Sequence, residues 1–109
     1  MKNNYQIDYR LWITKNNEAF LGKGRIALLL KIQELGSLKK ASEALKMSYR
    51  KAYYSINHLN TFAEQPVVIV KRGGKDGGST LLTPYGLALI ERFEKLSKAF
   101  EEFVERQKL

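Results

Sequence analysis

The sequence predicts an α+β fold that is mostly helical, because its hydrophobic pattern changes along the chain in three ways. Apolar residues alternate with polar ones near the start, which is typical of a strand with one buried face. They recur every three or four residues in the middle and again at the end, which is typical of amphipathic helices. Between these helical regions, two short extended runs flank a glycine-rich stretch, which favours a hairpin.

The composition limits the range of possible functions. At 109 residues the chain is long enough for one domain with a single core. It has no cysteine and a single histidine, His58, so we expect no disulfide, no metal site and no cofactor. No apolar run reaches the length of a membrane span, and the first ten residues lack a signal-peptide core, so we expect a soluble cytoplasmic protein.

The net charge of +8 is concentrated in the middle of the chain. Residues 37–83 carry eight cations and three anions, residues 1–36 carry six and three, and residues 84–109 carry five of each. A basic centre beside a neutral C-terminal segment is typical of a surface that binds a polyanion such as nucleic acid. The simpler alternative is a basic surface that only keeps the protein soluble.

The first predicted element is a β-hairpin within residues 1–22. Apolar side chains occupy every second position of residues 5–13, which predicts a strand with one buried face. Residues 14–17 include two asparagines, which tolerate a left-handed backbone, so we expect a turn there and a second strand at residues 19–21. Trp12 falls on the polar face, where it is either a surface ring or a subunit contact.

Three helices are predicted between residues 24 and 63. Helical periodicity begins at Gly24, and Gly36 follows the last apolar position as a C-terminal stop. Ser37 and Ser48 are the expected N-caps of the second and third helices. The expected buried positions are Ile26, Leu28, Leu29, Leu30, Ile32, Leu35, Leu38, Ala41, Leu45, Ala52, Ile56, Leu59 and Ala63.

The second and third of these helices have the spacing of a helix-turn-helix at residues 37–60. Only residues 46–48 separate them, which predicts a tight turn. The second helix of such a motif is the recognition helix, which enters the major groove of DNA. We therefore expect residues 48–63 to form a recognition helix.

The outward face of the predicted recognition helix carries side chains that can read base edges. Arginine can bind guanine through two hydrogen bonds, asparagine can bind adenine in the same way, and tyrosine rings can contact thymine methyl groups or phosphate. Taken singly, each such residue is equally well explained as part of a solvated helix face. Because base edges are reached from the N-terminal part of such a helix, the candidates are strongest near its start. They are Tyr49, Arg50, Tyr53 and Tyr54, with Lys51 on the flank and Asn57 as a more distant candidate.

A glycine-rich basic loop follows this helix. Residues 67–70 and 80–83 predict the two strands of a hairpin with residues 71–79 as its loop, and a hairpin directly after a helix-turn-helix indicates a winged helix. A nucleotide-phosphate loop is the rival, but the Gly-Lys-Ser/Thr order is missing and no helix follows. We expect the loop of this wing, residues 67–83, to contact phosphate or the minor groove. Its DNA-binding candidates are Lys71, Arg72, Gly73, Gly74, Lys75, Gly77, Gly78 and Ser79.

The last predicted helix spans residues 84–107 and starts with Pro84 after the capping residue Thr83. This helix is longer than the core of a small domain can cover, so we expect it to form a homodimer interface. Packing on the hairpin of its own subunit is the alternative. The expected interface residues are Ile90, Phe93, Leu96, Ser97, Phe100, Phe103 and Val104.

Together these motifs resemble a known family. The chain is similar to the N-terminal DNA-binding domain of ModE-type, molybdate-responsive transcription regulators, itself similar to the winged helix of LysR-type regulators. This similarity rests on GSLKKASEALKMSYRKAYYSINHLN, on KRGGKDGGSTLLTPYG and, more weakly, on FLGKGRIALLLKI. The resemblance implies a homodimer that binds a pseudo-palindromic operator in double-stranded DNA. It places residues 71–79 in the wing, and at the operator it places Ser48, Tyr49, Arg50, Lys51 and Tyr53.

The resemblance is incomplete in one respect. ModE-type regulators continue into a molybdate-binding domain, for which 109 residues leave no room. We therefore expect sequence-specific transcriptional regulation, with no molybdate or other effector bound within this chain. The alternative function is a protein-interaction module that uses the Tyr-rich face. We do not expect an enzyme, because no nucleophile and base are paired in the sequence and His58 is better explained as a surface side chain of the recognition helix.

Overall fold

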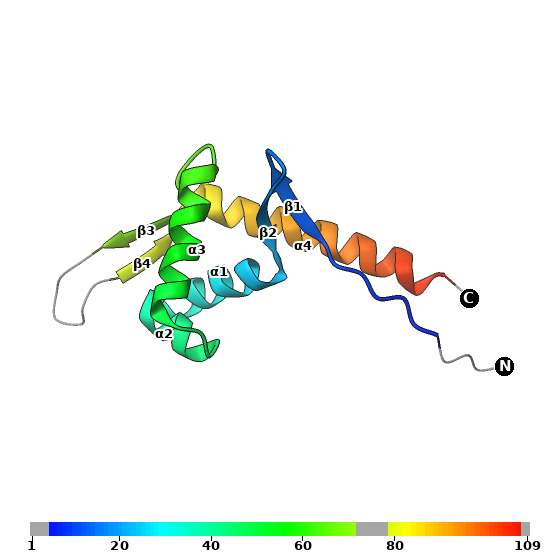
Figure 1. The fold of residues 1–109 in the computed structure, drawn as a ribbon, viewed down its shortest axis with the longest axis horizontal. Coiled ribbons are helices and arrows are strands. Elements are labelled where there is room, and N and C mark those ends of the chain that lie inside the picture. Colours follow the sequence, from blue (N-terminus) through cyan, green and yellow to red (C-terminus); the bar gives the residue numbers. More distant parts are fainter. Residues whose placement is uncertain (1–4, 72–78, 108–109) are drawn as a thin grey trace.

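The computed structural model describes residues 5–71 and 79–107. In these residues the chain forms four helices and two antiparallel hairpins (Figure 1). The predicted α+β class is therefore confirmed. In chain order the elements are β1 (Trp12–Lys15), β2 (Glu18–Gly22), α1 (Lys23–Leu35), α2 (Leu38–Ala44), α3 (Tyr49–Phe62), β3 (Val68–Lys71), β4 (Ser79–Leu82) and α4 (Pro84–Glu105).

The N-terminal hairpin is shorter than the sequence predicts. Strand β1 begins only at Trp12, which pairs with Gly22, and residues 5–11 have no regular secondary structure. The predicted strand is therefore wrong for the residues before Trp12. Strand β2 ends at Gly22, directly before α1, so it offers those residues no backbone partner. The predicted turn is confirmed only at Asn16 and Asn17, which adopt left-handed conformations with φ of 52° and 64°, because Thr14 and Lys15 still belong to β1.

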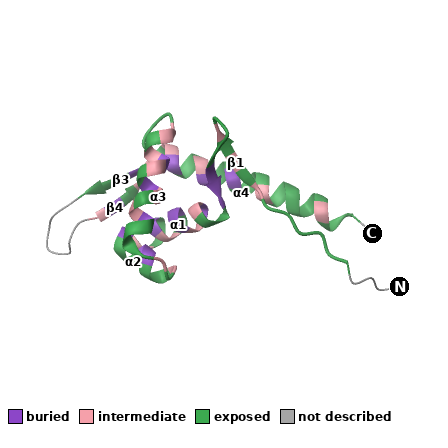
Figure 2. Ribbon diagram, in the orientation of Figure 1, coloured by how far each residue is buried: buried purple, intermediate pink, exposed green. Residues whose placement is uncertain are grey.

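Helices α1, α2 and α3 share one apolar core (Figure 2). Gly36 ends α1 in a left-handed conformation with φ of 67°, as predicted. Leu30 was expected in the core but is exposed, and Leu35, Leu45 and Ala63 are only partly buried. The buried core consists of Phe20, Leu21, Ile26, Leu28, Leu29, Ile32, Leu38, Ala41, Ala52, Ile56, Leu59, Val67, Val68, Ile90 and Phe93.

The connection between α2 and α3 is short and capped. Ser37 and Ser48 cap the two helices as predicted, and each side chain accepts a hydrogen bond from the backbone N–H three residues later. Because α2 ends at Ala44, the connection begins one residue earlier than expected. Lys46 turns the chain in a left-handed conformation with φ of 57°.

Hydrogen bonds join the β3–β4 hairpin to the helices at two places. The N–H of Thr80 donates to the carbonyl oxygen of Gly36, and the Thr80 Oγ1 accepts from the N–H of Leu38, both at 3.0 Å. On the other strand, the side-chain amide of Asn60 in α3 bonds the backbone of Val67 and Val68. These bonds fix the hairpin between the end of α1 and the end of α3.

Helix α4 packs on the core over its first half only. Thr83 caps it by accepting from the N–H of Gly86 at 2.9 Å, as the sequence predicts. Ile90 and Phe93 are 5% exposed in the core of their own chain, which leaves little of either side chain for the predicted dimer interface. The second half projects away from the core, beside residues 5–11 (Figures 1 and 2). In the part of the chain that the structure describes, no helix is both long and apolar enough to cross a membrane.

Candidate nucleic-acid interface

The outward face of α3 contains an open hollow of about 540 Å³. Two cations line this hollow, and no acidic residue does. Its other lining groups are hydroxyl, phenol and amide side chains, which both donate and accept hydrogen bonds. The lining residues are Ser48, Arg50, Lys51, Tyr53, Tyr54 and Asn57, six of the seven residues that the sequence analysis placed on the recognition helix.

The seventh predicted residue, Tyr49, lies at the edge of this face. Its ring stacks on that of Tyr53, with 6.2 Å between the centroids and 20° between the planes. Tyr49 is 49% exposed and Tyr54 is 67% exposed, whereas Tyr53 is partly buried and packs against the core. Tyr53 therefore supports the face as well as lining it, while about half of Tyr49 and two thirds of Tyr54 remain accessible.

Ser48 and Lys51 are linked at the start of α3. The Ser48 Oγ accepts from the backbone N–H of Lys51 at 3.1 Å, which satisfies one of the free donors of the first turn. The Lys51 side chain remains exposed beside the positive end of the helix dipole. This end of the helix is therefore suited to a negatively charged group such as phosphate.

Both strands of the predicted wing are described, but of its loop only Lys71 and Ser79 are. These two residues pair across the hairpin, so each strand lies one residue closer to the loop than the sequence predicts, at residues 68–71 and 79–82. Lys71 is exposed and Ser79 is partly exposed. The remaining wing candidates lie outside the described residues: Arg72, Gly73, Gly74, Lys75, Gly77 and Gly78.

A polar cluster lies behind α3, where that helix meets the N-terminal hairpin and α1. His58 Nδ1 is 2.8 Å from the Arg25 Nη1, and His58 Nε2 is 3.1 Å from the Glu18 Oε1. The His58 side chain is only 13% exposed, so the expectation of a surface histidine is wrong. Burial lowers the pKa of the Arg25 guanidinium, and electrostatic interactions with Tyr54 and Glu18 partly offset that effect.

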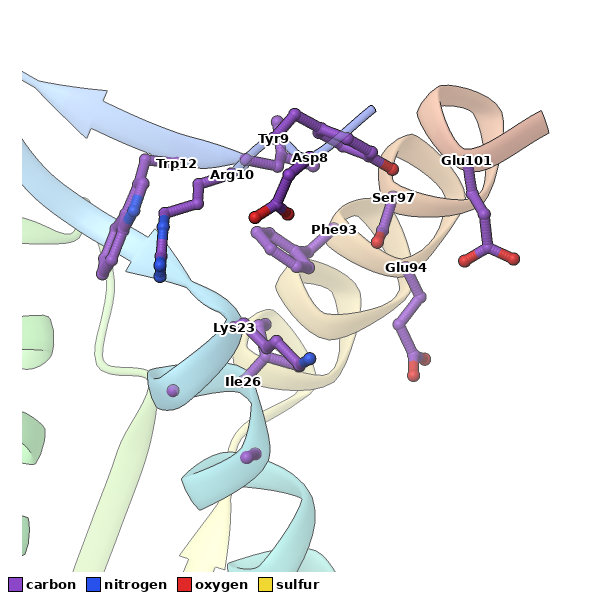
Figure 3. A pocket seen from close by; sticks show the side chains of 13 residues that line it. Asp8, Tyr9, Arg10, Trp12, Lys23, Ile26, Phe93, Glu94, Ser97 and Glu101 are labelled. Atoms are coloured by element: carbon purple, nitrogen blue, oxygen red, sulfur yellow. The ribbon is translucent and has the colours of Figure 1, made fainter. Parts of the chain in front are cut away.

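A second hollow, of about 890 Å³, lies between residues 8–12, the start of α1 and residues 93–101 of α4 (Figure 3). Phe93 and Ser97, both predicted to form the dimer interface, line it together with Glu94 and Glu101. Of the other predicted interface positions, Ile90 is buried, Leu96, Phe100 and Phe103 are exposed, and Val104 is partly buried. The exposed large apolar side chains of α4 are thus Leu87 near its start and Leu96, Phe100 and Phe103 in its second half.

Comparison with known proteins identifies the type of domain. No family model matches the chain. The chain is 36% identical to the transcriptional regulator ModE of Yersinia pestis over 100 residues, which cover 88% of this chain and 38% of that protein. It is 33% identical to the DNA-binding transcriptional dual regulator ModE of Escherichia coli (strain K12), with the same coverage. It is also 33% identical to the molybdenum transport protein ModE of Azotobacter vinelandii over 86 residues, or 79% of this chain and 32% of that protein.

The chain is a ModE-type domain. It spans between 32% and 38% of the length of these three relatives. The face of α3 in this ModE-type domain was recognisable from the sequence, because helical periodicity brings residues three or four apart to one side. The Arg25 and Glu18 partners of His58 were not, because they lie 33 and 40 residues away in the chain and no local pattern links them.

Proposed function

We propose that this chain is a sequence-specific, DNA-binding transcriptional regulator of ModE type, built as a winged helix-turn-helix. Helix α3 is the recognition helix and the β3–β4 hairpin is the wing. The observation that carries the proposal is the hollow on α3, where two cations and four neutral hydrogen-bonding side chains gather on an exposed face without any acidic group. The names of its relatives support this function, since they describe transcriptional regulators.

The side chains of the hollow divide into two roles. Arg50 is suited to bind guanine O6 and N7 in the major groove, and Asn57 to bind adenine N6 and N7. The rings of Tyr49 and Tyr54 are exposed enough to contact thymine methyl groups or phosphate. Lys51 and Ser48, at the start of the helix, are placed to bind phosphate and set the register on the duplex, as is Lys71 in the wing.

We further propose that the protein acts in the cytoplasm as a homodimer that binds two half-sites of double-stranded DNA. Leu96, Phe100 and Phe103 on the second half of α4 expose apolar surface that a second copy would cover. The interface predicted from the sequence is revised accordingly, because Ile90 and Phe93 already pack within their own chain. We assign no effector site, cofactor or enzymatic activity to these residues.

Selection of binding sites followed by titration tests the proposal. A random duplex library is enriched on the protein, and the selected duplex is compared with an unselected one by fluorescence anisotropy across a salt series. We expect tighter binding to the selected duplex and a linear fall of log affinity with log salt. Equal binding to both duplexes would contradict sequence-specific regulation.

A protein-interaction role for the Tyr-rich face is the second candidate, favoured by the exposure of Tyr49 and Tyr54. The same titration separates the two functions. Phosphate contacts weaken steeply as salt rises, whereas an aromatic protein interface responds much less. Absence of DNA binding even at low salt would favour the protein-interaction role.

A further inference from the structure

The polar cluster behind α3, made of Glu18, Arg25 and His58, connects three elements that are distant in the chain. Arg25 comes from α1, Glu18 from β2 and His58 from α3. The Arg25 Nη1 also donates to the carbonyl oxygen of Phe20 at 2.9 Å, so its guanidinium is held by the hairpin as well as by the histidine. None of the three residues lines the hollow on α3.

The partners of His58 determine which of its ring nitrogens carries the proton. Arginine has no acceptor atom, so the His58 Nδ1 must accept the hydrogen bond from Arg25. The proton is then on Nε2, which donates to the Glu18 carboxylate. Two directed hydrogen bonds from different elements fix both the tautomer and the plane of this ring.

The fixed ring of His58 lies beside a tyrosine of the DNA-binding face. Tyr54 is one helical turn before His58 and stacks with it, with 6.4 Å between the centroids and 24° between the planes. Phe62, one turn after His58, stacks with it at 4.3 Å and 25°. His58 is therefore the middle ring of a column along α3, and Tyr54 is its exposed end on the hollow.

We propose that Arg25 and His58 are positioning residues for sequence-specific DNA binding, which act by holding the Tyr54 ring in one orientation on the face of α3. The inference rests on the proposed function and adds two residues that contact no DNA themselves. A ring that is ordered before binding loses less conformational entropy when it docks in the major groove. The effect should appear with the preferred duplex, where Tyr54 meets a defined base, and be small with random DNA, where phosphate contacts dominate.

The test uses the full chain, with the selected duplex and a random duplex as probes. We expect His58→Ala to weaken binding to the selected duplex about tenfold and binding to random DNA by less than about twofold. His58→Gln should weaken binding to the selected duplex nearly as much as His58→Ala, because a glutamine amide can accept from Arg25 and donate to Glu18 but has no ring to stack on Tyr54. In a Tyr54→Ala background, His58→Ala should have little further effect on binding, since the Tyr54 ring that His58 orients is already absent.

The Lys31→Gln variant is the control for Arg25→Gln, because each removes one positive charge. Both remove one cation from α1, but Lys31 bonds only the exposed Glu34 on the same helix. We expect Arg25→Gln to reduce selectivity for the selected duplex and Lys31→Gln to leave it unchanged. If His58→Ala fails to fold, Glu18→Ala replaces it, because Glu18 is largely exposed and only one hydrogen bond of the cluster is removed.

The outcomes separate this inference from the function on which it rests. If the wild type is selective and the His58 and Arg25 variants remain equally selective, the positioning role is refuted while DNA recognition stands. An unselective wild type would refute the proposed function, and the positioning role with it. An equal loss on both duplexes, or full selectivity of His58→Gln, would reduce the cluster to a purely structural contact and would also refute the inference.

Discussion

Asn60 and Val68 exchange two hydrogen bonds between a side chain and a backbone. The N–H of Val68 donates to the Asn60 Oδ1 at 3.1 Å, and the Asn60 Nδ2 donates to the carbonyl oxygen of Val68 at 2.8 Å. The Oδ1 also accepts from the N–H of Val67 at 2.8 Å. The amide thus takes the place of a neighbouring strand for the start of β3 and joins the proposed wing to the proposed recognition helix.

Replacement of this amide should destabilise the fold. Asn60→Ala removes three hydrogen bonds and leaves three partly buried backbone groups without their partner, which should lower the free energy of unfolding by about 2 to 4 kcal/mol. Urea denaturation followed by circular dichroism measures the change. Thr61→Ala, at an exposed neighbouring position, is the control and should change stability by less than about 0.5 kcal/mol. A loss below about 1 kcal/mol for Asn60→Ala would contradict the anchoring role.

Two glycines should respond to alanine in opposite ways. A Cβ atom at Gly86 would stand 2.4 Å from the carbonyl oxygen of Val67, while one at Gly24 would meet no atom within 4 Å. We therefore expect Gly86→Ala to destabilise the protein by about 1 to 3 kcal/mol through overpacking against backbone. Gly24→Ala, within α1, should stabilise it by about 0.5 to 1 kcal/mol through the better helix propensity of alanine. Thermal unfolding of the two variants compares them directly, and an unchanged or raised stability of Gly86→Ala would show that α4 tolerates a shift away from Val67.

The single tryptophan reports on the N-terminal hairpin. The Trp12 ring covers its strand partner Gly22 so closely that a Cβ there would stand 2.4 Å from two ring carbons. Gly22→Ala should therefore displace the indole into solvent and shift its fluorescence emission to longer wavelength. Gly24→Ala serves as control and should leave the emission unchanged. An unchanged spectrum for Gly22→Ala would mean that the indole does not rest on the glycine in solution.

Side chains of α3 should determine the sequence specificity of DNA binding, and those of the proposed wing should contribute affinity for any DNA. Arg50→Ala should cost about 1 to 3 kcal/mol on the selected duplex and relax the preference at one base position. Lys71→Ala should weaken binding to all duplexes alike and reduce the slope of log affinity against log salt by about one. Titration of both variants against the selected and random duplexes checks this division. Identical behaviour of the two variants would show that Arg50 also contacts only phosphate.

The proposed dimer should depend on the distal phenylalanines of α4. Phe103 is 55% exposed, so Phe103→Glu should leave the fold intact and place a charge in the apolar contact between copies. We expect sedimentation equilibrium to show a dimer for the wild type and a monomer for the variant. Lys95→Gln, at another exposed site of α4, lowers the net charge by the same one unit and serves as the control. A monomeric wild type would contradict the homodimer.

Much of the local structure was predictable from the sequence because it depends on neighbouring residues. Ser37, Ser48 and Thr83 cap their helices through hydrogen bonds to the N–H three residues later, and Gly36 ends α1, as the local patterns indicate. The exposed face of α3 follows from helical periodicity in the same way. These features need no information from distant parts of the chain.

The remaining features required the tertiary structure, because they depend on which elements meet. Residues 5–11 alternate as a strand would, but the hairpin offers them no partner, and only pairing makes a strand. Ile90 and Phe93 belong to the same apolar stripe as Phe100 and Phe103, yet only the first pair reaches the core of its own chain. The sequence by itself determined the helices, their caps and the face of α3. Tertiary packing decided which part of each apolar stripe is covered and brought Arg25, Glu18 and His58 together, because burial and hydrogen bonding between distant residues are set only when the elements pack.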